Sequence, residues 1–320
     1  MLVATQNGGV GLIKVYPKFE EDLLVRLFHK GIKAQWSADD VSWDDPLLFS
    51  PAQSQALARM LTPVYLGEQS AMIGASVVLP QMAAAGETTA QLYLSSFLMD
   101  EARHFEVLTQ LYRRLGTDPL TIREMPEMLR YHNRLRKGDR IDWVWGILIS
   151  DIFAKNFYQV YAKSQPEALF GKLSGRILRD ESRHQAFAEH YLKNKIPVIS
   201  EERRAALMDM KDDLLFIMDA MYARLGTDAA EVGMDGRLFL DHLSSEIEQK
   251  ARRIGLDPEH HEPGYPNGVK RFIHGVGTGL RQQAQDLGTK FQGLEASRDC
   301  DTCFLSLLCQ SNLFLRARCV

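Results

Sequence analysis

Two pentapeptides, Asp100-Glu101-Ala102-Arg103-His104 and Asp180-Glu181-Ser182-Arg183-His184, contain the only Glu-x-x-His pairs of the chain. Residues three positions apart share one face of an α-helix, so the Glu and the His of each pair can bind the same ion. In an extended chain the two side chains would point to opposite faces. The pentapeptides therefore predict two helices that each present a metal-binding face.

A single acidic residue among apolar neighbours precedes each pentapeptide. Glu68 precedes Glu101 by 33 residues, and Asp151 precedes Glu181 by 30. The chain thus repeats a helix with one carboxylate followed by a helix with Glu-x-x-His. Four-helix bundles with this content hold two metal ions between inward-facing side chains. The predicted ligands are Glu68, Glu101, His104, Asp151, Glu181 and His184.

The charges of this set favour two divalent cations. Four carboxylates buried together would repel one another, and two divalent cations would neutralise them. Oxygen and imidazole ligands suit iron or manganese, so we expect an Fe/Fe or Mn/Fe pair. Asp100 and Asp180 can each accept a hydrogen bond from the histidine of the other pentapeptide and fix its tautomer. Arg103 and Arg183 can in turn neutralise these aspartates.

Each of these motifs and acidic residues also has a simpler interpretation. A Glu-x-x-His pair on a helix is usually a solvated face, Glu68 alone can lie at the surface, and Asp151 alone can cap a helix or pair with Lys155. Lys155 lies one turn after Asp151. It is a tentative catalytic residue, a proton donor or a substrate tether if it faces the metals, or else a partner of an acidic residue.

The remaining sequence predicts an all-α fold. Ser50, Pro51 and Gln53 form a helix start with a capping box. The expected helices span about 51–80, 88–115, 119–135, 142–161, 166–195, 200–226, 235–254 and 267–293. We divide the chain into an N-terminal arm (1–50), a four-helix-bundle core that holds the metals (51–226), additional helices packed on the core (227–299) and a cysteine-containing tail (300–320).

Composition excludes several classes of protein. A formal net charge of -3 over 320 residues gives no support for nucleic-acid binding. No apolar run approaches the roughly 20 residues that a membrane span needs. The first residues lack the charged start and apolar stretch of a secretory signal. We therefore expect a cytoplasmic protein.

All four cysteines lie in the tail, at Cys300, Cys303, Cys309 and Cys319. Their number suits a zinc or iron–sulfur site. A redox pair that delivers electrons to the metals is a second interpretation, and a terminal segment that packs on an apolar surface is a third.

Several of these segments resemble the small subunit of class I ribonucleotide reductase and, above all, its relatives, the ligand-binding oxidases with an Mn/Fe or di-iron centre. The resemblance covers Trp36 to Tyr191 and is carried by Leu66-Gly-Glu-Gln-Ser, Met99-Asp-Glu-Ala-Arg-His and Ile177-Leu-Arg-Asp-Glu-Ser-Arg-His. It implies a ferritin-like bundle and the same six ligands, with Asp151 where the family has glutamate. It further implies a homodimer, an electron donor, and dioxygen as co-substrate with an apolar or acyl small molecule.

The chain departs from that family at three places. Leu108 stands where the reductase subunit has its radical tyrosine, and no tyrosine follows Tyr265. Gly146 and Ala71 stand where the ligand-binding oxidases form a tyrosine–valine crosslink. A radical-generating reductase subunit is therefore disfavoured. The leading hypothesis is a dimetal-carboxylate oxidase or oxygenase, and the alternative is a ferritin-like protein that oxidises and handles iron.

Overall fold

The computed structural model describes residues 2–4, 10–12, 22–257 and 261. Strands β1 (Leu2–Ala4) and β2 (Val10–Leu12) form a short antiparallel pair in which Leu2 lies opposite Leu12. The other regular elements of the described residues are helices. The α-helices are α1 (Leu23–Lys33), α2 (Pro51–Ala84), α3 (Thr88–Leu115), α4 (Pro126–Arg136), α5 (Arg140–Ser164), α6 (Leu169–Lys195), α7 (Glu201–Glu231) and α8 (Gly236–Ile254).

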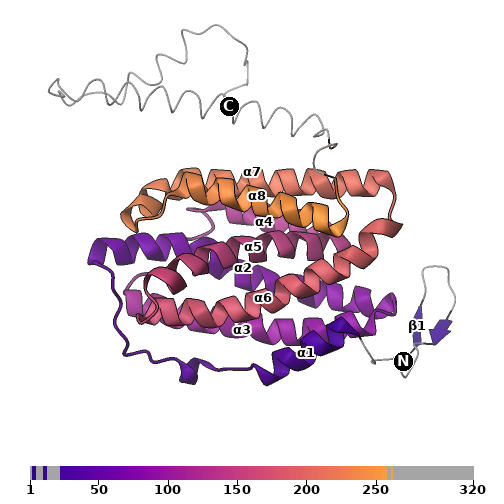
Figure 1. Cartoon of the computed structure of the whole chain (residues 1–320), viewed down its shortest axis with the longest axis horizontal. Helices are drawn as coiled ribbons and strands as arrows, with labels where there is room; N and C mark the ends of the chain where they lie inside the picture. The colour runs from indigo at the N-terminus through magenta and orange to yellow at the C-terminus, as the bar shows by residue number, and fades with distance from the viewer. Residues whose placement is uncertain (1, 5–9, 13–21, 258–260, 262–320) are drawn as a thin grey trace, which may run out of the picture. The chain divides into compact units, whose positions relative to one another are not determined.

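Four long helices, α2, α3, α5 and α6, form the centre of the bundle (Figure 1). Short loops join α2 to α3 and α5 to α6, so each pair is an antiparallel hairpin, and the two hairpins pack against each other. Helix α1 packs on α3 and α6, whereas α7 packs on α2, α4 and α5. Helix α8 covers α5, α6 and α7. The prediction of an all-α, four-helix-bundle core with additional helices is confirmed.

Local signals fix several helix ends. The side chain of Ser50 accepts a hydrogen bond from Gln53 N, and Gln53 Oε1 accepts one from Ser50 N, which is the predicted capping box. Helix α3 ends at Gly116, whose φ of 70° lies in the left-handed region that favours glycine. These signals set where α2 starts and where α3 stops.

Other predicted ends are wrong. The predicted helix over 119–135 starts only at Pro126, because the Glu124 carboxylate accepts hydrogen bonds from the backbone and hydroxyl of Thr121 and closes a turn there. The other differences are that α6 starts at Leu169, that α7 continues through Gly226 to Glu231, and that the arm contains α1 and the β1–β2 pair. The predicted helix over 267–293 and the four cysteines lie outside the described residues.

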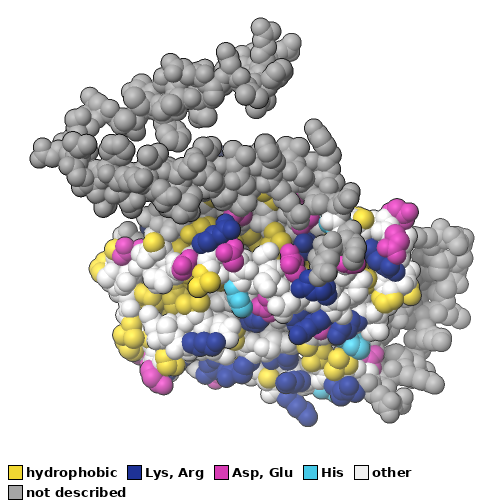
Figure 2. All heavy atoms as spheres, turned by 45° about the horizontal axis from the view of Figure 1, so that its top comes forward, with side chains coloured by type: hydrophobic (Ala, Val, Ile, Leu, Met, Phe, Trp, Pro, Cys, Tyr) yellow, Lys and Arg dark blue, Asp and Glu magenta, His cyan; other side chains and the backbone are white. Residues whose placement is uncertain are grey.

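The surface of the described part is mixed. On the face shown in Figure 2, lysine, arginine, aspartate and glutamate side chains are separated by hydrophobic and neutral groups. Within the described ranges, the helices are too short or too polar to cross a lipid bilayer.

Candidate metal centre

The six residues singled out in the sequence are buried at one place between α2, α3, α5 and α6. Donor atoms of Glu68, Glu101, His104 and Glu181 all lie within 4.8 Å of one another. Donor atoms of Asp151, Glu181 and His184 form a second such group. Glu181 is common to both groups. The arrangement is therefore two adjacent sets of donors that share one carboxylate, as two neighbouring ions would require.

Several donor atoms of this cluster make no well-formed hydrogen bond, although His184 Nδ1 lies 3.2 Å from Glu101 Oε1. They are Glu101 Oε1, His104 Nδ1, Asp151 Oδ2, Glu181 Oε2 and His184 Nδ1. Buried polar atoms are nearly always paired in native proteins, because an unpaired one loses its hydration without compensation. Oxygen and imidazole-nitrogen atoms that converge without partners are the donor set that iron and manganese accept. The residues present therefore fit a dimetal centre.

On the side away from the cluster, each histidine ring contacts an aspartate of the opposite pentapeptide. His104 Nε2 lies 3.1 Å from Asp180 Oδ2, and His184 Nε2 lies 3.3 Å from Asp100 Oδ2. Each aspartate thus leaves the Nδ1 atom of its histidine directed at the cluster. Arg103 Nη2 lies 3.0 Å from Asp180 Oδ2, and Arg183 Nη2 lies 3.1 Å from Asp100 Oδ2, so both aspartates are paired with cations.

The pKa values of the cluster residues indicate that the cluster carries an excess of negative charge. Burial raises the pKa of Glu101 well above its usual value, and the neighbouring carboxylates of Glu68 and Glu181 raise it further. Burial lowers the pKa of His104, but the carboxylate of Glu68 and the hydrogen bond to Asp180 outweigh it, and the pKa becomes about 9. Without cations, protons therefore offset the negative charge, and metal binding would displace them.

Two residues of this site were not identified from the sequence. Trp36 Nε1 donates to Asp180 Oδ2 at 2.8 Å, and the Arg103 guanidinium lies over the Trp36 ring, 4.8 Å from its centre. Gln35 Nε2 donates to Asp100 Oδ1 at 3.1 Å, and Gln35 Oε1 accepts from Arg103 Nη1. The resemblance described above begins at Trp36, but the sequence of this segment carries no signal for these partners.

Lys155 does not extend toward the cluster. Its ammonium pairs with Glu246 of α8, and the other oxygen of Glu246 accepts from Asn156 Nδ2 at 2.9 Å. Of the two interpretations of Lys155, the structure places it with an acidic partner, where it ties α5 to α8. This position gives no support to a catalytic role.

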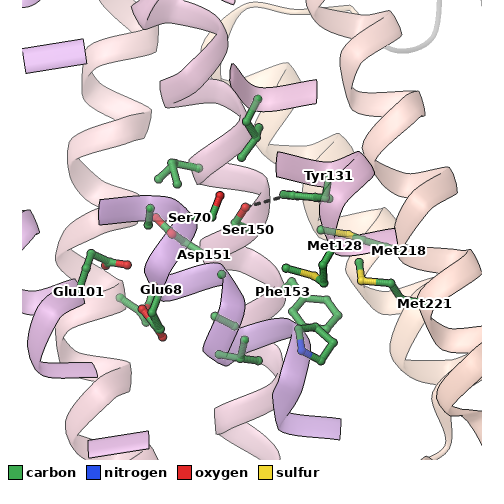
Figure 3. A pocket seen from close by; sticks show the side chains of 18 residues that line it. Glu68, Ser70, Glu101, Met128, Tyr131, Ser150, Asp151, Phe153, Met218 and Met221 are labelled. Atoms are coloured by element: carbon green, nitrogen blue, oxygen red, sulfur yellow. Dashed lines mark hydrogen bonds between the residues drawn. The ribbon is translucent and has the colours of Figure 1, made fainter. Parts of the chain in front are cut away.

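A cavity that we call the metal cavity opens beside the cluster and has an empty volume of about 630 Å³ including its mouth. Glu68, Glu101 and Asp151 lie on one side of it, and Met128, Met218 and Met221 lie on the other (Figure 3). Glu181 also lines this cavity. Ile147, one turn before Asp151, lines the cavity. Phe97, Leu108 and Ile177 also lie one turn from a ligand, but they are buried in the core and do not line the cavity, and Phe97 packs against the His184 ring.

Comparisons with known proteins bear on the fold. No protein-family model matches the chain, and no curated protein matches its sequence. Among solved structures, an R2-like ligand-binding oxidase with an Mn/Fe cofactor, in a tyrosine-to-phenylalanine variant, has a TM-score of 0.63 at 16% identity over 77% of this chain and 99% of that chain. A valine-to-leucine variant of an R2-like ligand-binding oxidase has a TM-score of 0.61 at 17% identity over 77% of this chain and 99% of that chain.

A second kind of structural neighbour is a protein with aldehyde deformylating oxidase activity from Synechococcus. Its TM-score is 0.52 at 21% identity, over 65% of this chain and 93% of that chain. Identities this low show a shared fold and leave the reaction open. The resemblance inferred from the sequence is thereby confirmed at the level of structure: the chain has the ferritin-like helical fold of the R2-like ligand-binding oxidases.

Proposed function

We propose that the protein is a dioxygen-dependent oxidoreductase with a carboxylate-bridged Fe/Fe or Mn/Fe pair. The observation that carries the proposal is the set of buried, unpaired donor atoms that four helices bring together. When bound, such a pair supplies the redox equivalents and the Lewis acidity that oxygen-dependent oxidation requires. The structural neighbours named as oxidases support the proposal, although they show only the fold.

The protein's own side chains would hold the ions and keep their ligands oriented. Glu68, Glu101, His104 and Glu181 would hold one ion, and Asp151, His184 and Glu181 would hold the other. Asp100 and Asp180 would fix the histidine tautomers, because each accepts a hydrogen bond at Nε2. The paired arginines would keep these aspartates ionised.

The metal cavity would bind the substrate and exclude bulk water. Its outer wall consists of Phe153 and the three methionines, side chains that adapt to apolar ligands. Hydroxyl groups also line the cavity, where Tyr131 and Ser150 hydrogen-bond to each other at 2.8 Å (Figure 3). This lining suits a substrate with an apolar body and few polar groups. Complete reduction of dioxygen would also require an external electron donor.

Adding ferrous iron to metal-free protein in air tests this function. We expect iron uptake to saturate at about two ions per chain and oxygen to be consumed in step with it, as two adjacent ligand sets imply. His184→Ala should lower both the bound iron and the oxygen consumed. Glu106→Gln, which changes an exposed carboxylate on the same helix as His104, should change neither.

Two outcomes would contradict the proposal. Continued uptake of many irons per chain would favour iron oxidation and handling, which is the alternative function of this fold. A protein that binds no iron at all would show that the ligand set is not functional.

A further inference from the structure

Three methionines, here called the cavity methionines, lie across the metal cavity from the carboxylates of the cluster (Figure 3). Met128 belongs to α4, whereas Met218 and Met221 belong to α7 and share one face of it, because they are three positions apart. The three residues are 6%, 3% and 5% exposed, respectively. Their thioether groups are therefore enclosed in the same cavity as the predicted metal ligands and are shielded from bulk solvent.

The other side chains that line the metal cavity accept an oxygen atom poorly. They are aliphatic groups, carboxylates, serine hydroxyls, the Phe153 ring and the Tyr131 phenol, whose oxygen is hydrogen-bonded to Ser150. Among the described residues that line this cavity there is no cysteine, histidine or tryptophan. Thioether sulfur is soft and polarisable, and it takes up one oxygen atom to become a sulfoxide. The cavity methionines are therefore the groups in this space that an oxygen-donating oxidant attacks most readily.

The other described methionines differ from these three in exposure or in position. Met99 on α3 is 62% exposed. Met82, Met125 and Met208 are at most 2% exposed, yet they do not line the metal cavity, although Met125 precedes Met128 by only three residues. An oxidant in bulk solvent would reach Met99 first, whereas an oxidant formed at the cluster would reach the cavity methionines first. Position, and not burial alone, thus distinguishes the two cases.

We propose that the cavity methionines are oxidation sites that accept an oxygen atom when dioxygen reacts at the metal centre and no substrate fills the cavity. The inference rests on the proposed function, because the oxidant must form at the cluster. In the balanced step, two bound ferrous ions give up one electron each and one methionine sulfur is oxidised by two electrons. The O–O bond breaks, one oxygen atom forms the S–O bond of the sulfoxide, and the other takes up two protons from solvent and leaves as water.

Oxidation of these thioethers spares the side chains that hold the metals. The Nδ1 atoms of His104 and His184 point into the cluster, so these rings are next to any oxidant formed there. A thioether across the cavity offers such an oxidant a more reactive target. The cavity methionines therefore act as sacrificial groups that protect the ligand set during reaction without substrate.

Oxidation of the full-length wild-type protein tests the inference. Metal-free protein receives about two ferrous ions per chain under isotopically labelled dioxygen, without an organic substrate and with catalase to remove peroxide from bulk solution. Tandem mass spectrometry of its peptides then locates each added oxygen atom. We expect labelled sulfoxide at the cavity methionines, up to about one for every two ferrous ions oxidised, since the balanced step uses two. Met82, Met125, Met208 and Met99 should stay at background.

Substitutions separate the position of the thioethers from their number. His184→Ala, which removes a predicted ligand, should reduce the labelled sulfoxide to the level found without iron. The triple variant Met128→Leu, Met218→Leu and Met221→Leu keeps a similar apolar volume but lacks the thioethers. Repeated cycles of ferrous loading, oxidation in air and removal of iron should abolish its iron-binding capacity in fewer cycles than in the wild type.

The matched control is the triple variant Met82→Leu, Met125→Leu and Met208→Leu, which changes three equally buried methionines outside the metal cavity. It should lose iron-binding capacity at the rate of the wild type. Equal rates of loss in the two triple variants would overturn the protective role of the cavity methionines.

Oxygen consumption, measured in parallel, distinguishes failure of this inference from failure of the proposed function. Oxygen consumed without labelled sulfoxide at the cavity methionines, or with label at Met99 before them, would overturn the inference and leave the oxidase standing. A protein that consumes no oxygen with ferrous iron would refute the oxidase, and the inference with it.

Discussion

His104 Nε2 lies 3.1 Å from Oδ2 of Asp180, a residue of the other Glu-x-x-His helix, so α3 and α6 hold each other's ligands. The reciprocal contact joins His184 to Asp100. Because each aspartate also pairs with arginine, a ligand ring cannot rotate without breaking contacts to both helices. The metal centre and the packing of α3 on α6 are therefore one structural unit.

Asp180→Asn should weaken metal binding by roughly 10- to 100-fold, as loss of an outer carboxylate does in other metal sites. The amide can no longer accept the His104 N–H as an anion, so the tautomer and ring orientation are less fixed. Competitive titration of ferrous or manganous ion against a chelator measures the change. Glu106→Gln serves as the surface control, and unchanged affinity in Asp180→Asn would show that the contact does not orient the ligand.

Glu101→Gln should stabilise the metal-free protein while it weakens metal binding. Burial and two neighbouring carboxylates raise the pKa of Glu101, so folding without a cation forces this carboxyl to take up a proton, which costs free energy at neutral pH that glutamine avoids. We expect the melting temperature of the metal-free variant to rise by about 2–4 °C, as a gain of about 1 kcal/mol implies for a protein of this size. The increase in melting temperature on metal binding should be smaller in the variant than in the wild type. A lower melting temperature in the metal-free variant would contradict this account.

Gly74→Ala should destabilise the protein by about 1–3 kcal/mol, because the new Cβ would overlap Trp143 Nε1 and force the indole or α2 to move. Gly175→Ala on α6 is the matched control. Its Cβ would meet no atom within 4 Å, so the higher helix propensity of alanine should stabilise it by up to about 1 kcal/mol. Chemical denaturation measures both. Equal effects of the two substitutions would contradict a close approach between Gly74 and Trp143.

Glu87→Gln should lower stability in a pH-dependent way. Burial raises the pKa of Glu87, but Arg140, Lys195 and Tyr191 outweigh it and hold the pKa below its usual value. A carboxyl whose pKa is depressed by folding stabilises the protein above its unfolded pKa, and this contribution is lost as the pH falls through the folded value.

At pH 7 the variant should therefore be about 1–2 kcal/mol less stable than the wild type, the value of hydrogen bonds to charged partners. The difference should shrink as the pH falls below about 4.5, the usual glutamate pKa. Urea denaturation of both proteins at several pH values measures it. A difference that stays constant down to acid pH would place the contribution of Glu87 in packing.

The sequence by itself determined the helices and the faces that carry the ligands. A spacing of three residues on a 3.6-residue helix fixes that Glu181 and His184 point the same way, whatever surrounds them. Capping at Ser50 and the left-handed glycine at 116 are likewise local effects of a few neighbouring residues. For such features the backbone hydrogen bonds and side-chain geometry of one segment suffice.

Only the tertiary structure decided which partners these faces meet. Trp36 and Asp180 are 144 residues apart, and Lys155 and Glu246 are 91 apart, so no local pattern pairs them. The metal cavity is lined at once by residues of α2, α3, α4, α5, α6 and α7. Such contacts follow from how side chains of different helices fill a shared space, and that packing is a property of the whole fold.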